Sequence, residues 1–256
     1  MVFQIHLLYF AKTLMQYFSA KELKENRDKV KERMTKFNGP TIRHGFGLRV
    51  FEKYAGSDKN SAILDCGTAA GGFIEDLHRS GFKNLYGLDI DNYLAAGKEK
   101  LLKEFKTVDL SFDKIPWPDN FFKVLTAWCL VPHLENPYNF FREAFRVLDK
   151  DGLLIVSLIN VASPPNRKYF KKHGNFPAYH KKNNHIAILT PAVFEKTALK
   201  YFDFVGREYF ITPRIFNGIQ GRLRKFSYNL SSHSAKLKTY LENRWGAKEI
   251  DILMKK

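Results

Sequence analysis

Three carboxylates follow three successive apolar segments that are typical of short buried strands. Asp65 follows residues 62–64, Asp89 follows residues 84–88, and Asp109 follows residues 105–108. The carboxyl ends of parallel strands meet at one edge of a sheet, so we expect these side chains to surround one ligand. Asp89 is placed to accept hydrogen bonds from two ribose hydroxyls, and Asp109 from the exocyclic amine of a base. The three acids therefore predict a ligand that contains adenosine.

A glycine-rich turn, residues 67–72, follows Asp65 and precedes a helical pattern. Such a turn lets a ligand approach the backbone, and the helix N-terminus favours negative charge. The turn matches the dinucleotide pattern G-x-G-x-x-G only at Gly67 and Gly72, because Ala69 stands at the middle glycine. Asp65 precedes the first glycine, where dinucleotide folds commonly have no acid. An adenosine ligand with a cationic amino-acid tail is therefore favoured over a dinucleotide.

Alternating strand and helix patterns surround these residues. The predicted strands are residues 62–64, 84–88, 105–108, 122–129, 153–159, 202–212 and 249–254. The predicted helices are residues 20–36, 47–55, 73–79, 92–104 with Asp91 as N-cap, 137–148 and 190–200, with a further helical stretch before the last strand. This alternation predicts an α/β fold with a doubly wound, mostly parallel seven-stranded sheet and helices on both faces.

The sequence resembles the class I S-adenosylmethionine-dependent methyltransferases, most closely their subgroup of small-molecule and glycan enzymes. The resemblance is carried by the runs LDCGTAAGGFIEDL, LYGLDID, VDLSFDKIPWPDNFFKVLTAWCLVPHLENP and REAFRVLDKDGLLIVSLIN, and the closing run AKEIDILMKK is similar too. It implies a Rossmann-like fold with N-terminal helices, a helical insertion before the last strand, and S-adenosyl-L-methionine as the cofactor. The superfamily is diverse, so the resemblance leaves the methyl acceptor open.

Carried over by position, the resemblance implies a set of cofactor-binding residues. They are Asp65, Gly67, Ala69 and Gly71 for the methionine part, Asp89 and Ile90 for the ribose, Asp109 and Leu110 for the adenine, and Trp128 near the sulfonium. The sequence departs from the family at Ala69, where glycine is usual, and at Lys123, where an acid is common. Neither departure removes a carboxylate of the expected site.

His133 is the candidate catalytic residue. It follows the fourth predicted strand, where it could remove a proton from the acceptor, and the alternative is a local hydrogen bond. Arg43 and His44 precede the helix that leads to the first strand and are weaker candidates for a site position. His173, His180 and His185 have poor spacing for a metal, and no metal is expected. For His185 and Tyr179 we expect surface positions.

The net charge of +16 is concentrated in three segments. Residues 161–190 and 211–240 each carry six Lys/Arg and no Asp or Glu, and residues 1–36 carry the remaining excess. We expect a helical segment over residues 1–40 and a methyltransferase domain over 41–256, with an acceptor loop at 161–189 and a basic helical insertion at 213–244. The charge predicts an anionic acceptor, with a small molecule or glycan favoured over nucleic acid.

Several alternatives stay open. The chain could be an RNA methyltransferase or RNA-binding protein, or a non-catalytic binding protein on the same fold. The insertion could be a lid over the acceptor, a contact with an anionic membrane, or a helix pair that completes the core. We expect Cys66 and Cys129 to be reduced and buried, and hence a cytoplasmic protein, with peripheral membrane contact as the alternative. The oligomeric state is not predicted.

Overall fold

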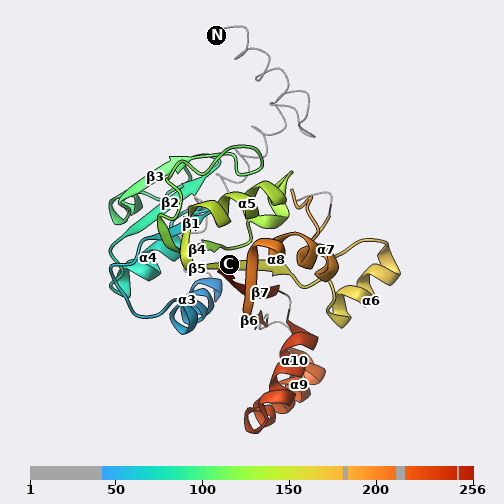
Figure 1. Ribbon diagram of the computed structural model, residues 1–256. Coiled ribbons are helices and arrows are strands. Elements are labelled where there is room, and N and C mark those ends of the chain that lie inside the picture. Colours follow the sequence, from blue (N-terminus) through green and yellow to red (C-terminus); the bar gives the residue numbers. More distant parts are fainter. Residues whose placement is uncertain (1–41, 181–183, 212–216, 247) are drawn as a thin grey trace. The chain divides into compact units, whose positions relative to one another are not determined.

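The computed structural model describes residues 42–180, 184–211, 217–246 and 248–256. All of these belong to one compact unit of the chain. The predicted helical segment over residues 1–40 lies outside the described residues. The fold is therefore described from the first helix of this unit, α3, to the last strand, β7 (Figure 1).

A seven-stranded sheet with the order β3-β2-β1-β4-β5-β7-β6 forms the centre of the fold (Figure 1). Its strands are β1 (Ile63–Cys66), β2 (Leu85–Asp89), β3 (Glu104–Thr107), β4 (Phe122–Ala127), β5 (Leu148–Ile159), β6 (Phe202–Phe210) and β7 (Lys248–Lys255). The first five strands pair in parallel, whereas β7 is antiparallel to both β5 and β6. The strand order reverses between β1 and β4, so ligands are expected at the carboxyl ends of these two strands. The predicted fold class is confirmed.

Helices cover both faces of the sheet. One apolar cluster joins α3 (Ile42–Ala55) and α4 (Gly72–Arg79) to one face, with Phe51 and Ile74 buried. A second cluster joins α5 (Pro137–Val147), α7 (Pro191–Lys196) and α8 (Ala198–Tyr201) to the other, with Phe140 and Phe194 buried. Alternate residues of a strand point to opposite faces, and so the strands contribute to both clusters.

Shorter elements and a separate helix pair complete the unit. They are the 3-10 turns η1 (Lys98–Leu101), η2 (Val131–His133) and η4 (Ser231–His233), and the helices α6 (Pro164–His173), α9 (Gly218–Leu230) and α10 (Ala235–Trp245). Figure 1 shows α9 and α10 beside each other, away from the helices that cover the sheet. α10 contacts α6 and β6, and both α9 and α10 contact the turn η4. The predicted helical insertion before the last strand is confirmed as this pair.

The predicted helix over residues 92–104 is wrong. The segment has only the short turn η1, and Asp91 caps no helix but accepts a hydrogen bond from the Asn92 N–H. Gly97 has a φ of 81°, a left-handed conformation that interrupts an α-helix. The apolar run of Leu94, Ala95 and Ala96 before that break is therefore too short to form a helix.

Two further predictions near the acceptor segments need correction. Residues 161–189 are not a continuous loop, because α6 begins after Ser163 with proline at its first position and ends at Gly174, whose φ is 70°. A proline at the first position and a glycine after the last are ordinary helix boundaries, but the segment was assigned as a loop. The predicted helix over 190–200 divides into α7 and α8 at Thr197, whose hydroxyl donates to the Val193 carbonyl at 2.6 Å.

Cys129 also differs from its prediction. Both cysteines are free thiols, but only Cys66 is buried within a strand. β4 ends at Ala127, and Cys129 lies beyond it, partly exposed, with a φ of 58°. Among the helices of the described segments, none is long and apolar enough to cross a membrane.

Candidate active site

Asp65 lies at the centre of the site, near the end of β1. It is 2% exposed, and the hydroxyl of Thr126 on β4 donates a hydrogen bond to its Oδ1 at 2.6 Å. Within the described residues, its Oδ2 accepts no hydrogen bond. Burial, with a smaller contribution from the charge of Asp89, raises the pKa of Asp65 to about 7. A buried carboxylate with one oxygen unpaired is suited to a cationic ligand group.

The glycine-rich turn needs its glycines. Gly67 and Gly71 both have a φ of 76°, which side chains rarely adopt. A Cβ at Gly67 would lie 3.2 Å from Leu130, and one at Gly71 would lie 3.1 Å from Leu94. Ala69 also has a positive φ, of 50°, which costs a non-glycine residue about 1–2 kcal/mol. The turn is therefore held tightly between α4 and the segments that follow β2 and β4.

Asp89 connects the end of β2 to this turn. Its Oδ2 accepts a hydrogen bond from the Ala69 N–H at 2.8 Å, and its Oδ1 accepts one from the Ile90 N–H at 2.7 Å. Burial raises the pKa of Asp89 to about 6, although the two N–H donors oppose the shift. The side chain of Ile90 is partly exposed beside it. The structure thus brings Asp65, the turn and Asp89 together, as predicted.

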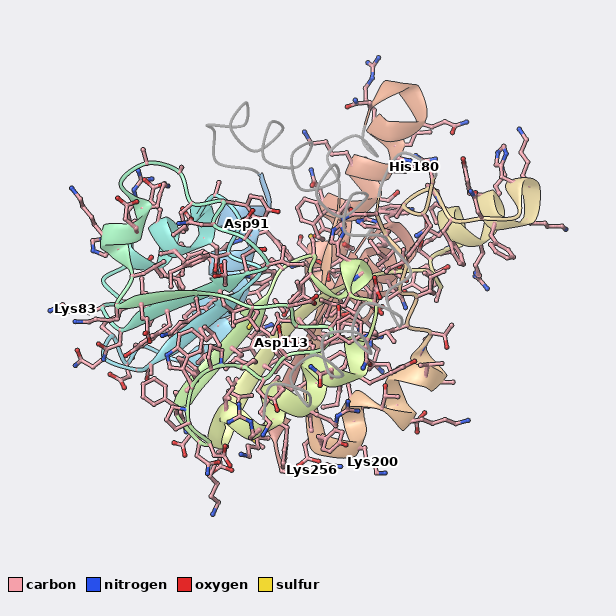
Figure 2. The ribbon with its side chains drawn as sticks, turned by 90° about the horizontal axis from the view of Figure 1, so that it is seen from above. Lys83, Asp91, Asp113, His180, Lys200 and Lys256 are labelled. Atoms are coloured by element: carbon pink, nitrogen blue, oxygen red, sulfur yellow. The ribbon has the colours of Figure 1, made fainter. Side chains whose placement is uncertain are left out.

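Asp109 lies two residues beyond the end of β3. The Val108 N–H before it donates to the Asp89 carbonyl at 2.8 Å, which places Asp109 beside the end of β2. Its Oδ1 accepts from the Ser111 N–H at 3.0 Å, and its own N–H is 3.4 Å from the carboxylate of Asp113, labelled in Figure 2. The Leu110 side chain is buried in the core, so only its backbone is placed for ligand contact.

Trp128 follows β4 and faces α3 and α4. Its ring makes an edge contact with Phe73 at 5.2 Å between centroids, and a Cβ at Gly47 would lie 3.3 Å from it. Its Nε1 is buried and has no hydrogen-bond partner within the described residues. Arg43 and His44 lie in the first turn of α3, where their side chains are outside the described part of the chain.

His133 ends the turn η2 and is exposed. Its ring centroid is 4.5 Å from that of His185, whose Nδ1 lies 2.7 Å from the Ala178 carbonyl. Since a carbonyl only accepts hydrogen bonds, Nδ1 carries the proton and Nε2 is the acceptor nitrogen of a neutral His185. Two backbone N–H groups, of Ile186 and Ala187, donate to the Pro132 carbonyl and fix this segment beside η2.

The predicted surface positions of His185 and Tyr179 are wrong. Both side chains are partly buried, with their rings 5.6 Å apart, and the Tyr179 hydroxyl donates to the Ala187 carbonyl at 2.7 Å. Burial raises the pKa of Tyr179 to about 12. The apolar run after His185 was a signal in the sequence that this segment packs against the domain, although a surface position was favoured for both rings.

Sequence reasoning also missed a group of charges between β6 and β7. The Arg207 guanidinium donates to both oxygens of Asp251, at 2.5 and 3.0 Å, and its Nη1 lies 3.5 Å from Glu249. Burial raises the pKa of Glu249 to about 7, with the charge of Arg207 opposing the shift. These ion pairs join two strands across the sheet. In the described part of the chain no three His, Cys, Asp or Glu residues gather as metal ligands.

Replacing Asp65 with asparagine is expected to stabilise the fold in alkaline solution. Because burial raises the pKa of this acid from 3.8 to about 7, ionisation opposes folding, and the cost grows as the pH rises through that window. We expect Asp65→Asn to raise the free energy of unfolding by roughly 4 kcal/mol at pH 8 and by less than half as much at pH 5. Urea denaturation at both pH values measures it, and a loss of stability at pH 8 would contradict the burial of a charge here.

Part of the chain matches a known protein family. Residues 64–156 match the sequence model of a family described as "Methyltransferase domain". The matched region begins in β1, ends in β5, and includes Asp65, the glycine-rich turn, Asp89, Asp109 and His133. Comparison with curated proteins gives no match in sequence.

Solved structures share the fold at low sequence identity. A chain of the complex between the Haloferax volcanii Trm112 methyltransferase activator and a methyltransferase is 12% identical, with a TM-score of 0.59 over 90% of this chain and 95% of that one. An S-adenosylmethionine-dependent methyltransferase from Thermotoga maritima, described as a possible histamine N-methyltransferase, is 15% identical, with a TM-score of 0.55 over 89% and 98%. One from Mesorhizobium loti is 14% identical, with a TM-score of 0.52 over 82% and 96%. At these identities the likeness is one of fold.

Proposed function

We propose that this chain is a class I S-adenosylmethionine-dependent methyltransferase, and we propose an acceptor and a set of site residues for it. The proposed reaction moves a methyl group to an oxygen or nitrogen of an anionic small molecule or glycan. The observation that carries the acceptor class is the basic segment 161–190, which has no acid and part of which is fixed beside His133.

The strand-end carboxylates fit the cofactor's polar groups. We assign the unpaired Oδ2 of Asp65 to the ammonium group of the methionine part, because a buried carboxylate is strongly stabilised by a cation. The turn from Gly67 to Gly71 approaches the same part through its backbone. Asp89 is assigned to the ribose hydroxyls, for which a carboxylate at the end of the second strand is suited.

The remaining cofactor contacts are assigned to the neighbouring segments. Asp109 is placed to accept from the adenine amine, and Leu110 offers its backbone because its side chain belongs to the core. Trp128 supplies an apolar wall and a buried Nε1 without a partner among the described residues. Trp128 follows the end of β4 directly and precedes His133 in the sequence.

When bound, S-adenosylmethionine supplies a methyl group already activated by its positive sulfonium. The protein then has to align the acceptor, exclude water and take up a proton, and alignment alone can be worth about 7–11 kcal/mol. We assign proton removal to His133. His185 packs against its ring and is itself fixed by the Ala178 carbonyl, so the pair is held in one orientation. His185 is a positioning residue in this proposal.

The test of the acceptor class is a screen with methyl-labelled cofactor. Matched pairs of acceptors, one phosphorylated or carboxylated and one neutral, would be compared for transfer of label. We expect the anionic member of a pair to be preferred and the preference to weaken as salt is added, because exposed charges are screened. Equal use of both members, or transfer only to RNA, would contradict the proposed acceptor.

Cofactor affinity is expected to depend on pH through Asp65. The free acid has a pKa of about 7, and the cationic ligand binds its ionised form, so binding below that pH must release a proton. We expect the affinity for S-adenosylmethionine to fall by up to about tenfold as the pH is lowered from 7 to 6, and more steeply where Asp89 is protonated too. Calorimetry in buffers of different ionisation enthalpy measures both the affinity and the number of protons released on binding. Asp65→Asn should bind more weakly with a flatter pH profile, and an unchanged profile would remove Asp65 from the contact.

A further inference from the structure

The helices α9 and α10 carry large apolar side chains that point to solvent. Their exposed fractions are 65% for Leu223, 68% for Phe226, 60% for Leu230, 43% for Leu237 and 58% for Tyr240. Leu223, Phe226 and Leu230 are three and four residues apart, so they form a single stripe along α9. A contiguous apolar stripe on a protein surface marks a contact with another body.

The opposite side of α9 packs toward α10 and the turn η4. Gly221 and Ser231 are buried there, and the Tyr228 hydroxyl donates to Glu242 on α10 at 2.8 Å. On α10, Leu241 is buried. The stripe of α9 therefore does not complete the core. For this face, the alternative of a helix pair that only completes the core is excluded.

The same helices also carry basic residues. They are Arg222, Arg224 and Lys225 on α9, Lys236, Lys238 and Arg244 on α10, and Arg167, Lys168, Lys171 and Lys172 on α6, which contacts α10. On α6, Tyr169 and Phe170 are exposed as well, at 39% and 47%. The sequence segments 161–190 and 211–240, which contain α6, α9 and most of α10, include no Asp or Glu.

We propose that α6, α9 and α10 form a docking surface for an anionic lipid bilayer. Such a surface attracts Lys and Arg, and it accepts Leu and Phe side chains at the level of the headgroups, so it matches both properties of these helices. RNA matches only the charge, because its bases stack on aromatic rings and would leave Leu223 and Leu230 exposed. The docking is peripheral, and α6 contributes to it basic residues of the segment that also supports the proposed anionic acceptor.

The test is sedimentation of the full-length protein with vesicles. One set contains phosphatidylcholine alone and the other adds phosphatidylserine. We expect binding to the anionic set, weakened by salt. Arg222→Gln with Lys236→Gln should lower the partition coefficient by about fivefold per charge removed. Leu223→Ser with Phe226→Ser should lower it by at least about tenfold, and both changes lie on exposed positions that the fold tolerates.

Matched controls remove the same kinds of side chain elsewhere. Lys83 and Lys200 are exposed and lie well apart from α9 and α10 in Figure 2, so Lys83→Gln with Lys200→Gln should bind as wild type. Tyr138→Ser, at a 41% exposed position on α5, is the apolar control.

Three results would overturn the proposal. They are no binding to anionic vesicles, equal losses in test and control variants, and a Leu223→Ser/Phe226→Ser protein that binds as wild type. A change from dimer to monomer in that variant without vesicle binding would identify a second copy of the chain as the partner instead. Cofactor titration of the same variants separates these outcomes from misfolding and from failure of the proposed function.

Discussion

Replacing His133 with alanine is expected to lower kcat by about 10²–10⁴-fold, the usual contribution of a general base. The cofactor's dissociation constant should barely change, because His133 is exposed at η2 and lies beyond the strand-end carboxylates. Single-turnover transfer of labelled methyl to an accepted substrate, measured across pH, gives the effect. The variant should also lose the acidic limb of the pH profile, since a histidine proposed as general base acts only in its unprotonated form.

Two further variants separate catalysis from structure. His173→Ala, an exposed position on α6, is the matched control and should keep wild-type turnover. His185→Ala should lower kcat by less than His133→Ala and shift the pH limb, because it removes the ring that holds His133 but not the base. Unchanged turnover in His133→Ala would remove it from the mechanism, and parallel losses of stability and cofactor binding would give it a structural role.

The Asp89→Ala protein is expected to bind S-adenosylmethionine and its demethylated product about 10–150-fold more weakly. Hydrogen bonds to a charged partner contribute about 1.5–3 kcal/mol, and this range converts to that loss. The same substitution removes the acceptor of the Ala69 N–H, which would loosen the turn next to the cofactor. Equilibrium dialysis with labelled cofactor measures the effect.

Asp91→Ala is the matched control for Asp89→Ala. Asp91 lies two residues after Asp89 and, among the contacts described, accepts a hydrogen bond only from the Asn92 N–H. Its replacement therefore changes the local charge but leaves the contacts of the turn in place. Its affinity should stay within about twofold of wild type, as for a surface charge. Equal losses in the two variants would mean that Asp89 acts through its charge alone and not through a hydrogen-bonded contact.

The sheet and the position of the acids could be predicted because local patterns determine them. The apolar runs before Asp65 and Asp89 are short and bounded by Gly and polar residues, and parallel strands leave few ways to connect them. The segment after Asp91 was mistaken for a helix because its apolar spacing is helical while the left-handed Gly97 decides the backbone. Helix propensity alone cannot decide between one glycine and the three apolar residues that precede it.

The contacts around the acceptor side could not be predicted from the sequence. His133 and His185 are 52 positions apart, and their rings meet only because the Pro132 carbonyl binds the segment after His185. The Arg207–Asp251 ion pair likewise joins two strands separated by the whole insertion. The Arg207–Asp251 contact depends on the register of β6 and β7, which no local pattern in the sequence specifies.

We propose that the β1–α4 turn and its carboxylates bind an adenosine cofactor with a cationic tail. Calorimetric titration of the wild-type protein with S-adenosylmethionine, and separately with NAD, measures this binding. We expect one S-adenosylmethionine site per chain, release of a proton near pH 6.5, and no heat from NAD. Tight binding of NAD with no response to S-adenosylmethionine would contradict it.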